Sequence, residues 1–246
     1  MRELKGRTVL ITGAGSGLGR AIAIRLARAG AHSIAADLNG AAAAQTAELI
    51  TGEHGAASHV ELDVTDQVGV RDVVQDLVAR FGDCFDGLIN NAGTDRGALI
   101  TELTHEQWQQ VVGVNQSGPL YLTREFVTAL GSAERAFPAD VVNVISISAI
   151  TVATGAAAYN SSKAALAMLT KIMQREALEC RWPIRVHGLM PSAMNTPMME
   201  QWNLADEVMM APDTVASAVE FMLTLPPDTF IQNLVINSRR EPGWPR

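Results

Sequence analysis

The chain has 246 residues, of which 48% are hydrophobic and 18% are charged, and its formal net charge is −7. This composition excludes the weakly hydrophobic, highly charged class of disordered chains, and the length suits one α/β domain, so we expect residues 1–246 to form a single domain. The acidic balance, with no run of Lys and Arg, argues against nucleic acid and anionic membranes as partners.

The cysteines and the N-terminus bear on the cell compartment and on metal binding. Cys84 and Cys180 are far apart and form no C-x-x-C motif, so we predict neither a disulfide nor a metal site, and we expect two buried thiols in a reducing compartment. The apolar stretch near the N-terminus is too short for a signal peptide or a membrane span. The sequence therefore predicts a cytoplasmic protein.

The first half of the chain predicts strands that alternate with helices. Residues 8–11 are a short apolar run, and a helix is predicted from about Gly17, with its apolar side chains on one face. Further along, the same alternation predicts a strand over 33–37, a helix over 41–51, a strand over 59–62, a helix over 68–81 and a strand over 87–90.

The second half continues this alternation. Thr104 and Gln107 have the spacing of a capping box at a helix start, and a long helix is predicted over 156–179. The predicted strands of this half cover 141–145, 184–189 and 234–236, and a further helix begins at about Pro212. Strands that alternate with helices of this length indicate the α/β fold class, with a parallel sheet covered by helices on both faces.

An irregular segment near 192–211 is rich in methionine, and its large apolar side chains are Met194, Met198, Met199, Trp202, Met209 and Met210. In this fold such a segment would cover a binding pocket as a lid, and methionine adapts to varied apolar shapes, so we expect an uncharged, partly apolar ligand. The alternative is that several of these methionines pack on the core. Residues 239–246 show no strand or helix pattern and are expected to form an irregular tail.

A glycine-rich loop joins the first predicted strand to the first predicted helix. Gly13, Gly17 and Gly19 follow the pattern T-G-x-x-x-G-x-G. Glycine permits the turn, so that backbone N–H groups of the loop and of the helix start, at Ser16 and Leu18, approach the pyrophosphate of a dinucleotide. The alternative is a tight turn without a ligand.

Asp37, at the end of the second predicted strand, is the candidate residue for cofactor selection. Its carboxylate can accept hydrogen bonds from both adenosine ribose hydroxyls and would repel a 2′-phosphate. No Lys or Arg stands at Leu38 or Asn39, and Ser16 is neutral, so the sequence favours NAD over NADP. Leu38, which follows Asp37, is expected to contact the cofactor as well. The alternative is that Asp37 caps the next helix.

Further candidate cofactor contacts follow the third and fourth predicted strands. Asp63 and Val64 come after the third strand, and Asn91, Ala92 and Gly93 come after the fourth. Open α/β sheets bind their ligands outside the carboxyl ends of the strands, so we expect both groups beside the cofactor.

The candidate chemistry lies in four residues of the second half. Tyr159 and Lys163 are four residues apart on the predicted long helix, so they share one face, and an ammonium together with a nicotinamide cation would favour the phenolate as an acid and base. Ser146, at a strand end, would hold the substrate oxygen, with Ser148 as a competing choice. Asn115 would fix a water that carries the proton from Lys163 to solvent. Purely structural roles stay open for each of these residues.

These motifs, in this order and spacing, resemble the short-chain dehydrogenase/reductase family over residues 8–236. The resemblance implies a Rossmann-type, doubly wound sheet of about seven parallel strands in three layers, and hydride transfer to or from nicotinamide. It implies a homo-oligomer, either a dimer or a tetramer. It also implies a catalytic tetrad of Asn115, Ser146, Tyr159 and Lys163, with a second role for Lys163 at the nicotinamide ribose. It further implies cofactor contacts from Pro191, at the strand end, and from Thr196, in the segment after it.

The sequence departs from the family pattern at two places. Pro191 is followed by Ser192 where the family usually has glycine, and the added Cβ is expected to affect the backbone beside nicotinamide. The usual glycine-ending motif at the last strand is replaced by residues 234–238 (LVINS), which leaves the placement of the tail open.

Three functions are consistent with these residues. The first is an NAD-dependent dehydrogenase that acts on a secondary alcohol, with Tyr159 as the general base. The second is an NADPH-dependent carbonyl or 3-ketoacyl reductase, which Asp37 opposes. The third is a nicotinamide-binding regulatory protein without catalysis, which the proton-transfer residues oppose.

Overall fold

The computed structural model describes residues 2–131, 135–202 and 204–240. Seven strands form one parallel sheet in the order β3-β2-β1-β4-β5-β6-β7, which confirms the predicted three-layer α/β fold. The strands are β1 (Thr8–Thr12), β2 (His32–Asp37), β3 (Ala56–Glu61), β4 (Phe85–Asn90), β5 (Ala139–Val144), β6 (Ile184–Pro191) and β7 (Leu234–Ile236). The α-helices are α1 (Gly17–Arg28), α2 (Gly40–Gly52), α3 (Gln67–Phe81), α4 (His105–Val112), α5 (Gly118–Leu130), α6 (Ala157–Glu179) and α7 (Pro212–Leu223).

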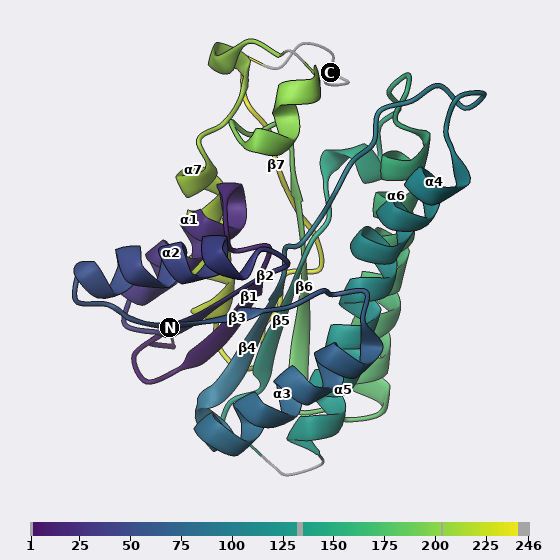
Figure 1. The fold of residues 1–246 in the computed structure, drawn as a ribbon. Helices are drawn as coiled ribbons and strands as arrows, with labels where there is room; N and C mark the ends of the chain where they lie inside the picture. The colour runs from purple at the N-terminus through teal and green to yellow at the C-terminus, as the bar shows by residue number, and fades with distance from the viewer. Residues whose placement is uncertain (1, 132–134, 203, 241–246) are drawn as a thin grey trace.

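Helices cover both faces of the sheet, with α1, α2 and α7 on one side and α3, α5 and α6 on the other (Figure 1). Along β1 the side chains alternate between the two layers. Val9 and Ile11 belong to the core beneath α1 and α7, whereas Leu10 belongs to the core beneath α3 and α5. Both faces of the central strand are therefore buried, which explains why its sequence is apolar throughout rather than alternating.

The boundaries of several elements differ from the predictions because strand pairing decides them. The strand predicted over 59–62 is β3, which begins at Ala56 because that residue pairs with His32 of the neighbouring strand. Helix α5 was not predicted from the sequence. The capping box at Thr104 is present: its hydroxyl accepts from the N–H of Gln107, whose side chain accepts from the N–H of Thr104.

The prediction of two buried thiols is wrong, because both cysteines are exposed. Cys84 ends a short 3-10 turn between α3 and β4, and Cys180 follows the last residue of α6. Both stand where a helix gives way to a connecting segment at the surface, and that position outweighs the tendency of free cysteine to be buried.

A buried charge network holds the amino ends of the central strands together. Asp140 is fully buried and accepts hydrogen bonds from Arg7 (2.7 Å), Arg185 and His187, while Arg7 also donates to Asp86. Burial opposes the charge of Asp140, but the bonds from His187 and the two arginines outweigh it and lower the pKa of the carboxyl. This network stabilises the amino ends of the central strands and leaves their carboxyl ends free for a site.

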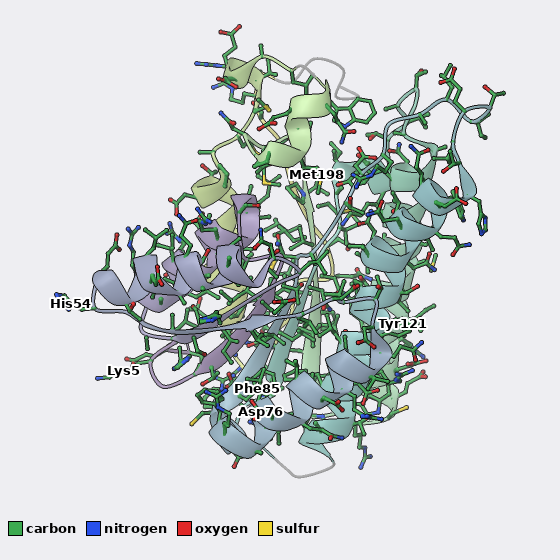
Figure 2. All side chains as sticks on the ribbon, viewed as in Figure 1. Lys5, His54, Asp76, Phe85, Tyr121 and Met198 are labelled. Carbon is green, nitrogen blue, oxygen red and sulfur yellow. The ribbon has the colours of Figure 1, made fainter. Side chains whose placement is uncertain are left out.

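The carboxyl ends of the strands lie beneath the segment that carries Met198, whereas Phe85 marks the amino end of β4 (Figure 2). Within the described residues, no helix is long and apolar enough to cross a membrane. Of the tail predicted over 239–246, residues 241–246 lie outside the described part of the chain.

Candidate active site

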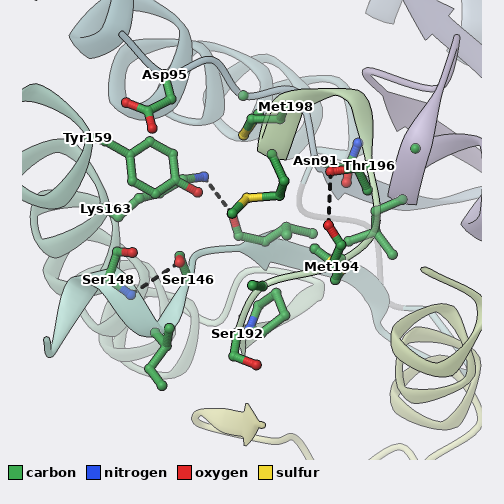
Figure 3. A pocket seen from close by; sticks show the side chains of 18 of the residues that line it. Asn91, Asp95, Ser146, Ser148, Tyr159, Lys163, Ser192, Met194, Thr196 and Met198 are labelled. Atoms are coloured by element: carbon green, nitrogen blue, oxygen red, sulfur yellow. Dashed lines mark hydrogen bonds between the residues drawn. The ribbon is translucent and has the colours of Figure 1, made fainter. Parts of the chain in front are cut away.

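A cavity of about 450 Å³ opens at the carboxyl ends of the central strands. Its wall is formed by the glycine-rich loop after β1, the segments after β4, β5 and β6, and the start of α6 (Figure 3). The chain reverses its direction across the sheet between β1 and β4, which are neighbours in the sheet, and ligands of doubly wound folds bind at such a switch point.

The glycine-rich loop has the backbone geometry of an anion site. Gly13 (φ 64°) and Gly17 (φ 51°) adopt left-handed conformations, and a Cβ on Gly19 would lie 2.2 Å from the carbonyl oxygen of Gly13. Ser16 is the N-cap of α1, yet its side chain makes no capping bond and the first turn carries no acidic residue. The free N–H groups of this helix start are therefore available to a phosphate. The loop residues that line the cavity are Gly13, Ser16, Gly17, Leu18 and Gly19.

Asp37 lies at the same end of the cavity. Its Oδ2 accepts from the N–H of Gly15 (2.9 Å) and its Oδ1 from the N–H of Asn39 (2.9 Å). The cap of α2 is Asn39, which accepts from Ala42, so the alternative role of Asp37 as a helix cap is wrong. The neighbouring Leu38 is 68% exposed and does not line the cavity.

Arg20 is a nearby cation that the sequence reasoning missed. It lies one turn into α1, and its guanidinium donates to the carbonyl of Gly15, to Thr46 (3.1 Å) and to Gln45 (2.9 Å). Gly15 thus has Asp37 on its N–H and Arg20 on its carbonyl. A sequence scan that considers only the loop and the residues after β2 does not find this contact, because a helical turn brings Arg20 back to the loop.

The residues after β4 tie the site together. Asn91 donates from Nδ2 to the carbonyl oxygens of Thr12 (2.8 Å) and Gly13 (3.3 Å), and this fixes the β4 loop to the glycine-rich loop. Asn91 and Gly93 line the cavity, whereas Ala92 does not. A Cβ on Gly93 would lie 3.4 Å from Asn115 Oδ1 and 3.7 Å from Lys163 Nζ, so Gly93 lies in direct contact range of both groups.

Asp63 and Val64 do not line the cavity. Asp63 Oδ1 accepts from the N–H and the hydroxyl of Thr65 at an exposed turn, and Val64 packs beneath Gly118. Their expected contact with the cofactor stays a prediction, and the cavity gives it no support.

Ser146, Tyr159 and Lys163 converge on one wall of the cavity (Figure 3). Ser146 follows β5, and its Oγ accepts from the N–H of Ser148 (3.1 Å), which also lines the cavity. Tyr159 lies in the first turn of α6 and Lys163 one turn later, with Nζ 5.7 Å from the centre of the tyrosine ring. Lys163 is 3% exposed and donates to the carbonyl of Val144 (2.9 Å).

Burial dominates the protonation of this pair. It raises the pKa of the Tyr159 phenol to about 12; the Ser146 hydroxyl lowers it, and the Asp95 carboxylate raises it further. Burial also lowers the pKa of the Lys163 ammonium to about 8. The protein groups by themselves therefore keep Tyr159 protonated near neutral pH, which is the opposite direction to the phenolate expected from the sequence. The same hydroxyl, phenol and ammonium can still hold an oxygen and exchange a proton with it.

Asn115 is fully buried and sits in a π-helical turn, Gly113–Ser117, between α4 and α5. Its Nδ2 donates to the carbonyl of Thr94 (2.9 Å) and to Ser162 (3.0 Å), and its Oδ1 accepts from the N–H of Thr94 (2.8 Å). These bonds hold the β4 loop against α6. The side chain does not line the cavity, so the predicted water relay is not supported by a free amide group.

Described residues of the 192–211 segment line the cavity. At the base of this segment Met194 pairs with Met210 in a parallel bridge, in which the N–H of Met210 donates to the carbonyl of Ala193 (2.9 Å) and its carbonyl accepts from the N–H of Asn195 (3.0 Å). Thr196 approaches Gly17 so closely that a Cβ on the glycine would be 3.2 Å from Thr196 Cγ2. The methionines divide between the two expected roles. Met194, Met198 and Met199 line the cavity, whereas Met210 is buried in the core beneath α1 and α7.

The two departures from the family pattern contact each other. The Oγ of Ser192 accepts from the N–H of Ser238 (3.2 Å), and the N–H of Ser192 donates to the carbonyl of Ile236 (2.9 Å). The hydroxyl that replaces a hydrogen at Ser192 is therefore used to fix the segment after β7, while Pro191, Ser192 and Thr196 all line the cavity.

Asp95 is a cavity residue that the sequence reasoning missed. It lies in the segment after β4, and its Oδ2 accepts from Trp202 Nε1 (2.9 Å) in a short 3-10 helix, Pro197–Trp202. Both side chains line the cavity beside Tyr159. Nothing in the sequence pairs residues so far apart, so this contact could only come from the fold.

Within the described ranges, no group of His, Cys, Asp and Glu side chains is arranged to hold a metal ion.

Comparison with known proteins gives the family. The model of the short chain dehydrogenase family matches residues 7–207. The 3-oxoacyl-acyl-carrier-protein reductase of Thermotoga maritima is 33% identical over 199 residues, which cover 81% of this chain and 78% of that protein.

One further relative and one solved structure are similar to this chain. The (3R)-3-hydroxyacyl-CoA dehydrogenase of Canis lupus familiaris is 30% identical over 237 residues, covering 89% of this chain and 90% of that protein. The structure of an alcohol dehydrogenase from Thermococcus sibiricus, solved with 5-hydroxy-NADP, superimposes with a TM-score of 0.86 at 24% identity and covers 97% of this chain and 99% of that chain. The chain therefore belongs to the short-chain dehydrogenase/reductase family and is an oxidoreductase that acts on CH–OH groups.

Proposed function

We propose that the protein is an NAD-dependent oxidoreductase that interconverts a secondary alcohol and a ketone. The observation that carries this proposal is the convergence of Ser146, Tyr159 and Lys163 on one wall of a cavity whose other end is the glycine-rich loop with Asp37. The open helix start and the close approach of Gly19 to Gly13 fit a dinucleotide pyrophosphate. When bound, this cofactor accepts or donates the hydride.

In the proposed mechanism the protein holds the substrate oxygen and moves its proton. The Ser146 hydroxyl donates a hydrogen bond to that oxygen, and Tyr159 takes the hydroxyl proton during oxidation or returns it during reduction. Because burial raises the pKa of Tyr159 to about 12, the phenol becomes a base only when positive charge is close to it. Lys163 supplies one such charge, since its pKa of about 8 keeps most of it protonated at neutral pH.

Other residues of the proposal support this step. The contact of Lys163 with Val144 fixes its ammonium beneath Tyr159, from where it would also bind the nicotinamide ribose. Thr196 would hold the carboxamide. Asn115 would assist the proton relay through its hydrogen bond to Ser162 of α6. The described residues of 192–211 would act as a lid.

The preference for NAD rests on Asp37. Its carboxylate lines the cavity, where it would bind ribose hydroxyls and repel a 2′-phosphate. Arg20 supports the second candidate, an NADPH-dependent carbonyl or 3-ketoacyl reductase, because this cation contacts Gly15, the same residue that Asp37 contacts. Its guanidinium is already bonded to Gly15, Thr46 and Gln45 and does not line the cavity, so NAD remains the better fit.

We also propose a homo-oligomer joined through the long helices α5 and α6. Large apolar side chains are exposed on both, and they include Leu120 on α5 and Met168, Ile172 and Leu178 on α6. Light scattering coupled to gel filtration would give a dimer or tetramer mass, and a monomer at micromolar concentration would contradict this part of the proposal.

A substrate panel tests the proposed activity. Secondary alcohols with NAD or NADP, and the matching ketones with NADH or NADPH, are followed by absorbance of the reduced nicotinamide. Turnover of alcohols or ketones with a preference for NAD supports the proposal. Tight NADH binding without turnover of any alcohol or ketone would instead favour the non-catalytic regulatory protein.

A further inference from the structure

Asp95 places a carboxylate in the wall of the substrate end of the cavity. The side chain is 5% exposed, and it lines the cavity together with Tyr159 and Trp202. Figure 3 shows it beside the Tyr159 ring, and its charge is close enough to raise the pKa of the phenol. A charge so well buried requires partners, because an ionised carboxylate loses favourable hydration when it is buried.

The partners of Asp95 within the described residues are too few. Oδ2 accepts from Trp202 Nε1 (2.9 Å), but Oδ1 has no hydrogen-bond partner and is enclosed by protein. The guanidinium of the adjacent Arg96 donates to the backbone carbonyl of Asp95 and to Thr94 Oγ1, not to the carboxylate. Burial raises the pKa of Asp95, although the bond from Trp202 and the backbone N–H and charge of Arg96 lower it. A carboxylate offers about four acceptor positions, and those of Oδ1 are unused.

A second unpaired acceptor lies in the same wall. Asn160 follows Tyr159 on α6, its Nδ2 donates to the carbonyl of Thr151 (2.9 Å), and its Oδ1 has no partner among the described residues. Two buried acceptor oxygens of cavity-lining residues, Asp95 Oδ1 and Asn160 Oδ1, therefore have no donor among the described residues. A ligand that brings donors relieves this imbalance, whereas one that brings a second carbonyl or an anion increases it.

We infer that Asp95 determines specificity by binding a hydrogen-bond donor on the substrate, next to the reacting carbinol. The substrate class is then a secondary alcohol that carries a neighbouring hydroxyl or ammonium group, such as a 1,2-diol or a 1,2-amino alcohol. This inference rests on the proposed alcohol oxidation. The donor takes the unfilled acceptor positions of Oδ1, and because this atom is enclosed by protein, binding requires a shift of the Asp95 side chain or of Trp202.

Three probes of the same size and shape test this inference, because they differ only in one group beside the carbinol: propane-1,2-diol, 1-aminopropan-2-ol and butan-2-ol. The quantity is the ratio of kcat/KM for each donor-bearing probe to kcat/KM for butan-2-ol. We expect both ratios to exceed about ten in the natural protein and to fall at least about tenfold in Asp95→Leu, as loss of one charge-assisted hydrogen bond predicts.

Matched variants separate the possible roles of the carboxylate. Asp95→Asn keeps an acceptor but removes the charge, so the amino alcohol ratio should fall further than the diol ratio. Trp202→Phe removes the indole donor and part of the ring system; if Asp95 served merely to anchor this side chain, Trp202→Phe would change the ratios as much as Asp95→Leu does. Glu102→Gln, which removes an exposed carboxylate farther along the same segment, should leave both ratios unchanged.

A binding measurement keeps the inference testable without turnover. Calorimetric titration of the three probes onto Tyr159→Phe protein saturated with NAD gives their relative affinities directly. Ratios that do not respond to Asp95→Leu, or a natural protein that favours butan-2-ol, would overturn the inference alone. Absence of turnover for every alcohol and ketone, despite NADH binding, would instead overturn the proposed function, and the titration would still decide the role of Asp95.

Discussion

Replacement of Asp37 by alanine should change the cofactor preference. In the structure Oδ2 of Asp37 accepts from Gly15 and Oδ1 from Asn39, and the carboxylate lines the cavity. A hydrogen bond to a charged group contributes about 1.5–3 kcal/mol, so net loss of one ribose contact should weaken NAD binding about 10- to 100-fold. Removal of the negative charge also relieves the repulsion of a 2′-phosphate, by about 1 kcal/mol at a partly exposed position.

The two effects add in the ratio of the dissociation constants for NADPH and NADH, which should fall about 100-fold in Asp37→Ala. The ratio is the right quantity because the lost bond to Gly15 perturbs the loop equally for both cofactors. Fluorescence titration of each reduced cofactor measures it. Arg20→Gln is the matched control: if this cation does not bind the 2′-phosphate, its loss leaves the ratio unchanged. An Asp37→Ala ratio equal to that of the natural protein would refute the role of Asp37.

Three further predictions concern the loop, the buried lysine and the charge network. Gly19→Ala places a Cβ about 2.2 Å from the Gly13 carbonyl oxygen, so NADH affinity by fluorescence should fall more than about tenfold; affinity equal to the natural protein would contradict the packing. Because burial lowers the pKa of Lys163 to about 8 from 10.5, the unfolded chain binds this proton more tightly, and stability should rise as pH increases through that interval. Lys163→Met should abolish turnover, and it should also remove the rise of stability with pH. At pH 7 it should increase the free energy of unfolding by up to about 3 kcal/mol, as measured by urea denaturation. A loss of stability at pH 7 would count against the buried ammonium. Asp140→Asn should cost about 3–5 kcal/mol in the same assay, because it leaves the buried Arg185 without its carboxylate partner, and a cost below 1 kcal/mol would exclude that reason.

Local signals in the sequence were enough for the sheet and for the two ends of the site. The apolar runs predicted the central strands β1, β4, β5 and β6 because buried parallel strands are apolar on both faces. The glycine spacing after β1 predicted the loop because only glycine fits where Gly19 meets Gly13. The positions of Tyr159 and Lys163 on one helix face follow from the helical period alone.

Features that depend on tertiary contacts were not predicted. Arg20 reaches the loop by a helical turn, and Asp95 meets Trp202 across more than a hundred residues of chain. The exposure of Cys84 follows from its position in a surface turn, which residue type does not reveal. The direction of the pKa of Tyr159 was also missed, because the extent of burial around a side chain is a property of the packed fold.

The proton-transfer role of Tyr159 is the central claim, and Tyr159→Phe tests it most directly, since the change removes one hydroxyl and keeps the ring that packs beside Lys163. The measurement is kcat for a secondary alcohol accepted by the natural protein, made beside the dissociation constant for NADH on the same samples. The account predicts a fall in kcat of at least about a hundredfold, the contribution typical of a general acid and base, with NADH affinity within about twofold of the natural protein. Turnover that survives the substitution would contradict it.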